Sequence, residues 1–205
     1  MNFSTNWLHG TKWTITAWTL QGRGPLKGAT PLHKALFFTS DRSFAEGSSG
    51  VSGKAVNVYQ STINEGSNVL DLSKPGVTCT PDESENFRKR VMQCRPGKTN
   101  VQAEYPEYWE KGWQTGAIMK LAHREHEAEK MQMMEYLATY QRDTPVGIDS
   151  FNLIQKMTRD CIEDIVDAAI AAGYQAVAGN ELQSKLTYPL LIVLDPNILS
   201  APVKV

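Results

Sequence analysis

The chain has 205 residues, of which 41% are hydrophobic and 21% are charged. Its 21 Lys and Arg residues against 22 Asp and Glu residues give a formal net charge of −1, so no overall basic excess favours binding to nucleic acid. This length and composition predict one globular domain over residues 1–205 and exclude wholesale disorder.

The first third of the chain is predicted to be largely extended. Four segments read as strands, from alternating or short apolar runs: residues 7–20, 36–40, 56–63 and 69–72. Two segments rich in Gly, with Pro or Ser, are predicted loops: residues 21–31 and 46–54. Asp41 directly follows the second strand, and we expect its carboxylate to cap a short helix.

The middle of the chain is predicted to be helical, and the end returns to strands. Residues 81–141 are polar, charged and rich in Met and aromatic side chains. A second helix begins at Asp149 or Ser150, carries apolar residues at three- and four-residue steps, and ends at Gly173. Two short strands follow with a loop between them: strands 176–178 and 190–194, loop 180–187. This order predicts an α+β domain with a mixed or antiparallel sheet.

Several classes of protein are disfavoured by the sequence. Three cysteines stand at wide spacing, without a C-x-x-C pair, and are expected to be free thiols: Cys79, Cys94 and Cys161. The apolar run at 190–194 is too short to span a bilayer, and no signal peptide is evident, so we expect a cytoplasmic protein without a membrane partner. His123 and His126 are three residues apart, not the four of a zinc-binding H-E-x-x-H helix, so no metal site is predicted.

Three segments carry residues suited to ligand binding. His9 followed by Gly10 brings an imidazole and an unobstructed backbone to the same side of a ligand. Leu36–Ala45 joins aromatic residues, which stack on flat rings, to hydroxyl residues, which bond a carboxamide or a ribose. Glu181 follows a short strand, where a carboxylate would stabilise positive charge at a sugar carbon. Each segment alone is also explained without a ligand, as a surface His, a capped core strand and a solvated Glu.

Taken in order, these segments resemble the ADP-ribosyltransferase superfamily, in the branch with a His-Gly-Thr or His-Gly-Ser first strand (poly(ADP-ribose) polymerase and diphtheria-toxin-like). Four stretches carry the resemblance: Leu8–Thr11, Leu36–Ala45, Gly173–Val177 and Ile192–Leu199. The chain looks especially like the small domains of phage and mobile-element proteins. The resemblance implies a split mixed or antiparallel sheet, with a helical insertion at about 75–150, and an effector acting in a bacterial host cytoplasm.

The resemblance also implies that NAD is the substrate and assigns residues to it. His9 would bond the ribose of the adenosine half, and the Gly10 backbone would pair with the nicotinamide carboxamide, with Thr11 beside it. Phe37 or Phe38 would stack on the nicotinamide, in the place where the family usually has Tyr.

At the catalytic carboxylate the sequence departs from the family. Ser40 and Ser43 would lie at the nicotinamide end of the pocket, but Leu190 stands where the family has its catalytic Glu. Either Glu181 supplies the carboxylate, or the pocket has lost it.

The implied function is transfer of ADP-ribose from NAD to a macromolecular target, a host protein rather than a nucleic acid. Nicotinamide would leave, and a target nucleophile would attack the oxocarbenium-like ribosyl cation. Three alternatives remain open. The first is NAD hydrolysis with water as acceptor. The second, which Leu190 favours, is a non-catalytic module that binds NAD or ADP-ribose. The third is a protein whose charged, Met- and Trp-rich middle binds a host factor.

Overall fold

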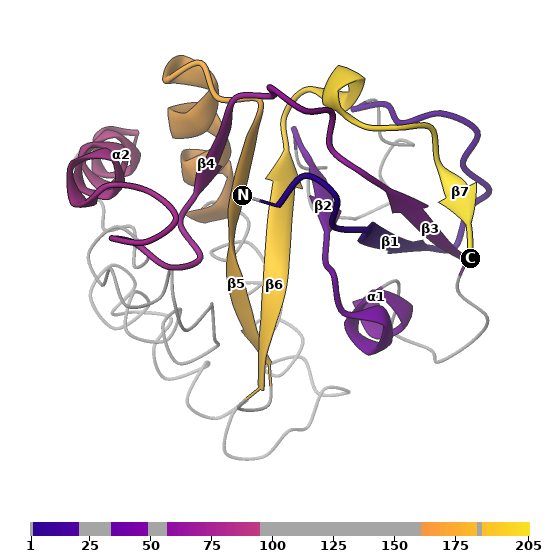
Figure 1. The fold of residues 1–205 in the computed structure, drawn as a ribbon. Helices are drawn as coiled ribbons and strands as arrows, with labels where there is room; N and C mark the ends of the chain where they lie inside the picture. The colour runs from indigo at the N-terminus through magenta and orange to yellow at the C-terminus, as the bar shows by residue number, and fades with distance from the viewer. Residues whose placement is uncertain (1, 21–33, 49–56, 95–160, 184–185) are drawn as a thin grey trace, which may run out of the picture.

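The computed structural model describes residues 2–20, 34–48, 57–94, 161–183 and 186–205, which form an α+β fold with two sheets (Figure 1). The strands are β1 (Trp7–Thr11), β2 (Leu36–Phe38), β3 (Asn57–Ser61), β4 (Val69–Asp71), β5 (Ala176–Gln183), β6 (Leu186–Val193) and β7 (Val203–Lys204). One sheet has the order β1-β3-β7 and is antiparallel. The other has the order β2-β6-β5-β4 and is mixed, because β4 pairs parallel to β5. The predicted α+β class is thereby confirmed.

Local sequence signals explain where the helices begin and end. The helices are α1 (Arg42–Ser48), α2 (Pro81–Gln93), a helix over 161–171, and the short 3₁₀ helix η1 (Pro196–Ile198). The Phe44 N–H donates to Asp41 Oδ1 at 2.8 Å, which confirms the predicted cap of α1. A capping box opens α2, with the side chains of Thr80 and Glu83 each accepting from the other's backbone N–H. Gly173 has φ of +79° and follows the helix over 161–171, as predicted.

The mixed sheet is buried on both faces, because successive side chains of a strand point to opposite sides. Val177 and Ile192 pack in one core cluster with α2 and the helix over 161–171, which lie beside β4 and β5 in Figure 1. Ala178 and Leu191 pack on the opposite face, in a cluster with Trp7 at the start of β1. A sheet covered on both faces has a fixed backbone. Its strand β2 forms one side of the site described below.

One predicted loop is wrong. Residues 180–187 were expected to be irregular, but β5 continues to Gln183 and β6 begins at Leu186, with Glu181 opposite Tyr188 in the register. The polar composition of these residues is compatible with strand because this end of the hairpin is largely exposed; Leu186 is 60% exposed. Glu181 therefore lies within a strand.

The first predicted strand is too long. β1 ends at Thr11, and residues 12–20 have no regular secondary structure. Within this segment Trp18 turns back to the body of the domain, whereas Trp13 is 48% exposed. Trp18 Nε1 donates to Ser200 O at 3.0 Å and to Ser61 Oγ at 3.2 Å.

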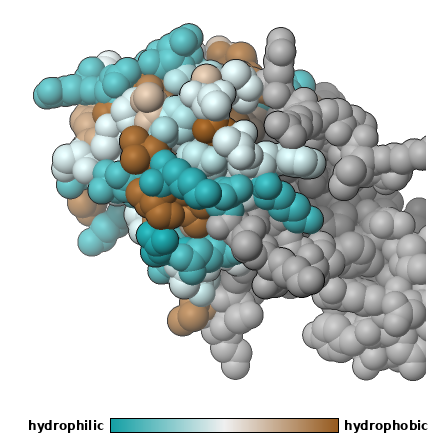
Figure 2. Space-filling model, turned by 90° about the vertical axis from the view of Figure 1, so that its right-hand side faces the viewer, coloured by the Kyte–Doolittle hydropathy of each residue, from teal (hydrophilic) through white to brown (hydrophobic). Residues whose placement is uncertain are grey.

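Several predictions fall outside the described residues. They are the helical middle beyond Cys94, His123 and His126, the start of the long helix, and most of the two Gly-rich loops. The part of the middle that is described, α2, packs into the core through Phe87 and Val91. None of the described helices has the length and apolar character needed to cross a membrane. The side that bears β7 shows hydrophobic residues in small groups between hydrophilic ones (Figure 2).

The two buried faces give a stability prediction with a matched control on the same strand. Leu191→Ala should lower the free energy of unfolding by about 2–5 kcal/mol, because it removes a completely buried side chain from the middle of β6. Leu186→Ala, at the exposed end of that strand, should change it by less than about 0.5 kcal/mol. Urea unfolding of both variants measures this, and equal losses would contradict the described arrangement.

Candidate functional site

The two sheets meet at one pair of residues and separate directly beyond it. Leu8 N donates to Thr39 O at 2.7 Å, and Thr39 N donates to Leu8 O at 2.9 Å. Continued antiparallel pairing would place Gly10 opposite Phe37. Instead, the Phe37 carbonyl accepts a hydrogen bond from the His9 ring, with Nδ1 at 2.7 Å from the oxygen. We call the place where β1 and β2 separate the split.

The backbone of Gly10 faces the split. Gly10 stands opposite Val58 of β3, but the Val58 carbonyl accepts from Val205 N at 3.0 Å and is therefore turned away from β1. Such a pair exchanges no ladder hydrogen bonds, so the N–H and C=O of Gly10 point to the other edge of β1, toward β2. One donor and one acceptor on the same residue are complementary to a primary carboxamide.

The bond to Phe37 fixes the chemical state of His9. A carbonyl oxygen only accepts, so Nδ1 carries the proton, and Nε2 of the neutral ring is a hydrogen-bond acceptor. Burial lowers the pKa of His9 below its ordinary value, and this effect exceeds the opposing effect of the bond to Phe37. The ring is therefore neutral at pH 7.

Two aromatic rings hold the imidazole in place. The centroid of His9 lies 5.7 Å from that of Trp18, edge-on at 82°, and 5.4 Å from that of Phe38. Trp18 and Phe38 also contact each other edge-to-face, at 4.8 Å. Because Trp18 is bonded to Ser61 and Ser200, its position is set by β3 and the C-terminal segment.

A cavity of about 330 Å³ lies beside His9. Its walls combine hydroxyl, indole and aliphatic side chains from β1, β2 and the segment after β1: His9, Thr11, Trp13, Thr14, Ile15, Thr16, Ala17, Trp18, Thr19 and Leu36. These walls are about equally polar and apolar, and this volume suits one nucleoside-sized fragment. His9 and Thr11, both predicted from the sequence, are thus brought together.

Other predicted residues lie elsewhere. Phe38 is 2% exposed in the core, so neither face of its ring is open to a ligand. The Phe37 side chain packs on the opposite face of the sheet, against the cluster that includes α2. Ser43 Oγ donates to Asp41 Oδ1 at 2.6 Å within the cap of α1, and Ser40 lines a different cavity.

Glu181 is not among the residues that line the His9 cavity. Because residues 177, 179 and 181 share one face of β5, its side chain lies on the side of Val177, whereas the ring of His9 contacts Phe38 on the opposite side. Its partner in the register, Tyr188, stacks on Phe44 of α1 at 4.5 Å and 11°.

Leu190, at the position of the expected catalytic Glu, is buried in the cluster with Val177 and Ile192. A carboxylate at this place would be surrounded by apolar side chains, so the described core requires an apolar residue here.

The segment over residues 12–20 was missed as part of the site. Its Trp13 and Trp18, separated by threonines and Ile15, line the cavity, but the same pattern is typical of a strand. Five Trp residues in the whole chain, three of them within the first 18 residues, were the available signal.

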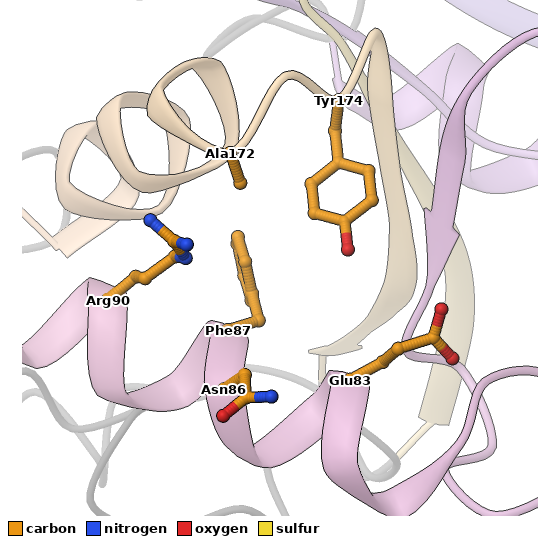
Figure 3. A pocket seen from close by; sticks show the side chains of 6 residues that line it. All are labelled: Glu83, Asn86, Phe87, Arg90, Ala172 and Tyr174. Atoms are coloured by element: carbon orange, nitrogen blue, oxygen red, sulfur yellow. The ribbon is translucent and has the colours of Figure 1, made fainter.

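Two further features have no catalytic geometry. A cavity of about 220 Å³ lies where α2 meets the turn after the helix over 161–171, with Phe87 and Tyr174 edge-to-face between Glu83 and Arg90 (Figure 3). Burial, with Glu83 nearby, raises the pKa of Tyr174, so the phenol stays protonated.

Burial also raises the pKa of the Cys79 and Cys94 thiols, which disfavours the nucleophilic thiolates. Within the described ranges, no three His, Cys, Asp or Glu residues are grouped to hold a metal ion.

Comparison with protein-family models, with curated proteins and with solved structures gave no match. The resemblance to ADP-ribosyltransferases, and the roles that it implies, therefore stay predictions.

The burial of His9 predicts a pH dependence of stability. Below about pH 6.5, the ordinary pKa of histidine, the unfolded chain binds a proton that the folded chain binds only at lower pH. The free energy of unfolding should therefore be highest above this pH and fall as the pH drops through it. Urea unfolding between about pH 5 and 8 should show this fall for the wild type and a smaller one for His9→Gln. Identical pH profiles would contradict the buried neutral ring.

Proposed function

We propose that this domain binds NAD at the split, with the nicotinamide carboxamide on the backbone of Gly10 and a hydroxyl of the adenosine ribose on His9 Nε2. The observation that carries the proposal is the termination of pairing between β1 and β2. Because the Phe37 carbonyl accepts from His9, the N–H and C=O of Gly10 are left directed toward the split. The carboxamide can donate to that C=O and accept from that N–H simultaneously.

The neutral state of His9 supports the same ligand. An imidazole with its proton on Nδ1 accepts a hydrogen bond at Nε2, and a ribose hydroxyl donates one. A neutral ring offers no charge for a free phosphate, so the site favours the nucleoside parts of a dinucleotide. The cavity beside His9, of about 330 Å³, holds one such part, and the remainder of NAD extends beyond it.

Calorimetry with NAD, nicotinamide and nicotinic acid tests this arrangement. Nicotinic acid should bind at least about tenfold more weakly than nicotinamide, because its carboxylate has no N–H to donate to the Gly10 carbonyl. His9→Phe should weaken the binding of both NAD and nicotinamide by at least about tenfold, because it removes the proposed ribose acceptor and also frees the Phe37 carbonyl to pair with Gly10.

Val77→Ala, at an exposed position outside the site, serves as the control and should bind all three compounds like the wild type. The thermal midpoint of each variant shows whether the fold is kept. Equal affinity for nicotinamide and nicotinic acid, or no binding of NAD by the wild type, would overturn the proposal.

ADP-ribosyl transfer is the second candidate, favoured by the position of α1. This helix packs on Leu8 of β1 through Ala45, and its Phe44 stacks on Tyr188, the register partner of Glu181. It thus connects the strand that carries Gly10 with the strand pair that carries a carboxylate. In the transfer, the C–N bond to nicotinamide breaks with its electrons leaving on nicotinamide, the carboxylate stabilises the ribosyl cation, and a target nucleophile forms the new bond.

Labelled NAD incubated with a bacterial lysate tests the transfer. The wild type should attach label to a protein and release nicotinamide, and Glu181→Gln should reduce both by about 100-fold. Glu65→Gln, an exposed glutamate in the turn before β4, is the matched control and should retain full activity. Nicotinamide release without label would replace transfer by hydrolysis. If neither signal appears while NAD still binds, the domain is a binding module and this second candidate is wrong.

A further inference from the structure

A second cavity, of about 480 Å³, lies on the face of the mixed sheet that carries Ala178 and Leu191. The N-terminal segment runs across β5 and β6 on this face, and it lines the cavity together with the sheet (Figure 1). The cavity shares no lining residue with the one beside His9. An occupant of this cavity is therefore independent of the proposed NAD site.

The register of the sheet directs the side chain of Asp71 into this cavity. Asp71 ends β4 opposite Ala178 of β5. Val69, two residues earlier and hence on the same face of β4, packs in one core cluster with Ala178. Asn180 and Pro189, which are paired across β5 and β6, continue this face toward the end of the hairpin. These residues line the cavity beside Asp71, so its carboxylate points from the sheet toward the cavity.

One oxygen of this carboxylate has no partner. Asp71 is 8% exposed, and its Oδ1 accepts from both the N–H and the hydroxyl of Ser73. Within the described residues, Oδ2 accepts no hydrogen bond and no ion pair involves Asp71. Oδ2 is not fully covered by protein, and it is therefore accessible from the cavity. Because carboxylates this buried are ordinarily paired with a cation, Asp71 indicates a cationic group in the cavity.

The same cavity is lined by a cation that does not neutralise Asp71. Lys74, in the turn after β4, forms no ion pair with Asp71 or with another residue of the described ranges. Thr78 Oγ1 accepts from Lys74 N at 3.2 Å and donates to Asp71 O at 2.7 Å, so one turn positions the backbone of both charged residues. Lys74 would repel a purely cationic ligand, and Asp71 would repel a purely anionic one. A zwitterion is complementary to both charges.

We propose that this cavity binds a free α-amino acid, with its ammonium group on Asp71 Oδ2 and its carboxylate on Lys74 Nζ. The other N–H groups of the ammonium can donate to hydroxyl oxygens of the lining, such as that of Thr5. The volume of about 480 Å³ lies within the range of small-ligand sites and leaves room for the amino-acid side chain, with Ala178 and Pro189 as apolar surface.

Calorimetry of the full chain with matched probes tests this proposal. Glycine, L-alanine, L-serine and L-glutamine are the zwitterions, ethylamine is alanine without the carboxylate, and propionate is alanine without the ammonium. At least one amino acid should bind in a saturable manner, at least about tenfold more tightly than ethylamine or propionate. In nuclear magnetic resonance spectra, that amino acid should shift the backbone amide signals of Gly179 and Asn180, which line the cavity, and leave the Gly10 signal in place.

Two variants and a control identify the groups involved. Asp71→Asn keeps the size of the side chain and an oxygen that accepts from Ser73, and it should weaken amino-acid binding by at least about tenfold. Lys74→Gln should weaken binding by about threefold, because an exposed charge pair contributes less. Asp82→Asn, at an exposed position in the first turn of α2, is the matched control and should bind like the wild type.

Three results would overturn the proposal. They are binding of ethylamine or propionate as tight as that of every amino acid tested, no binding of any of the four amino acids, and equal affinity of Asp71→Asn and the wild type. The thermal midpoint shows whether each variant is folded. The first two results are measured on the wild type, so they decide the proposal even if Asp71→Asn does not fold.

Discussion

The hydrogen bond from His9 Nδ1 to the Phe37 carbonyl determines how the two sheets of this domain are joined. It uses the carbonyl that would otherwise extend the pairing of β1 with β2, so the strands separate just beyond Leu8 and Thr39. The same bond sets the tautomer of His9, and the burial that accompanies it keeps the ring neutral. One side chain thus ends a ladder, leaves the Gly10 backbone directed to the split and lines the adjacent cavity.

This bond depends on a backbone that is held from both sides. Phe37 and Phe38 are consecutive, so their side chains enter the two opposite core clusters of the mixed sheet. The β2 backbone between them is fixed by pairing with β6, and the Phe37 carbonyl has a defined position. By packing in opposite clusters, the two phenylalanines therefore fix the β2 backbone beside the site. Their aromatic character had predicted that they stack on a ligand ring.

Signals within a few residues were readable from the sequence, whereas contacts between distant backbone groups were not. Asp41 and Gly173 mark helix ends through their own chemistry, and both are found where predicted. The far end of the β5–β6 hairpin was missed because exposed strands tolerate the polar residues that usually indicate loops. His9 was recognised as a candidate, but its partner is a main-chain carbonyl 28 residues away, which no side-chain pattern reveals.

The binding groups and the candidate catalytic group belong to different parts of the fold, and they respond differently to substitution. In the proposed complex, recognition at the split would rest largely on the N–H and C=O of Gly10, which persist through most changes of neighbouring side chains. A catalytic carboxylate belongs to a side chain, so a single substitution removes it. Leu190, at the position where the resemblance would place the catalytic Glu, is an apolar side chain in the core beside Val177, where a charge would be buried. Ligand binding at the split is therefore compatible with an apolar residue at this position, whereas transfer depends entirely on a carboxylate such as Glu181 reaching the bound ribose.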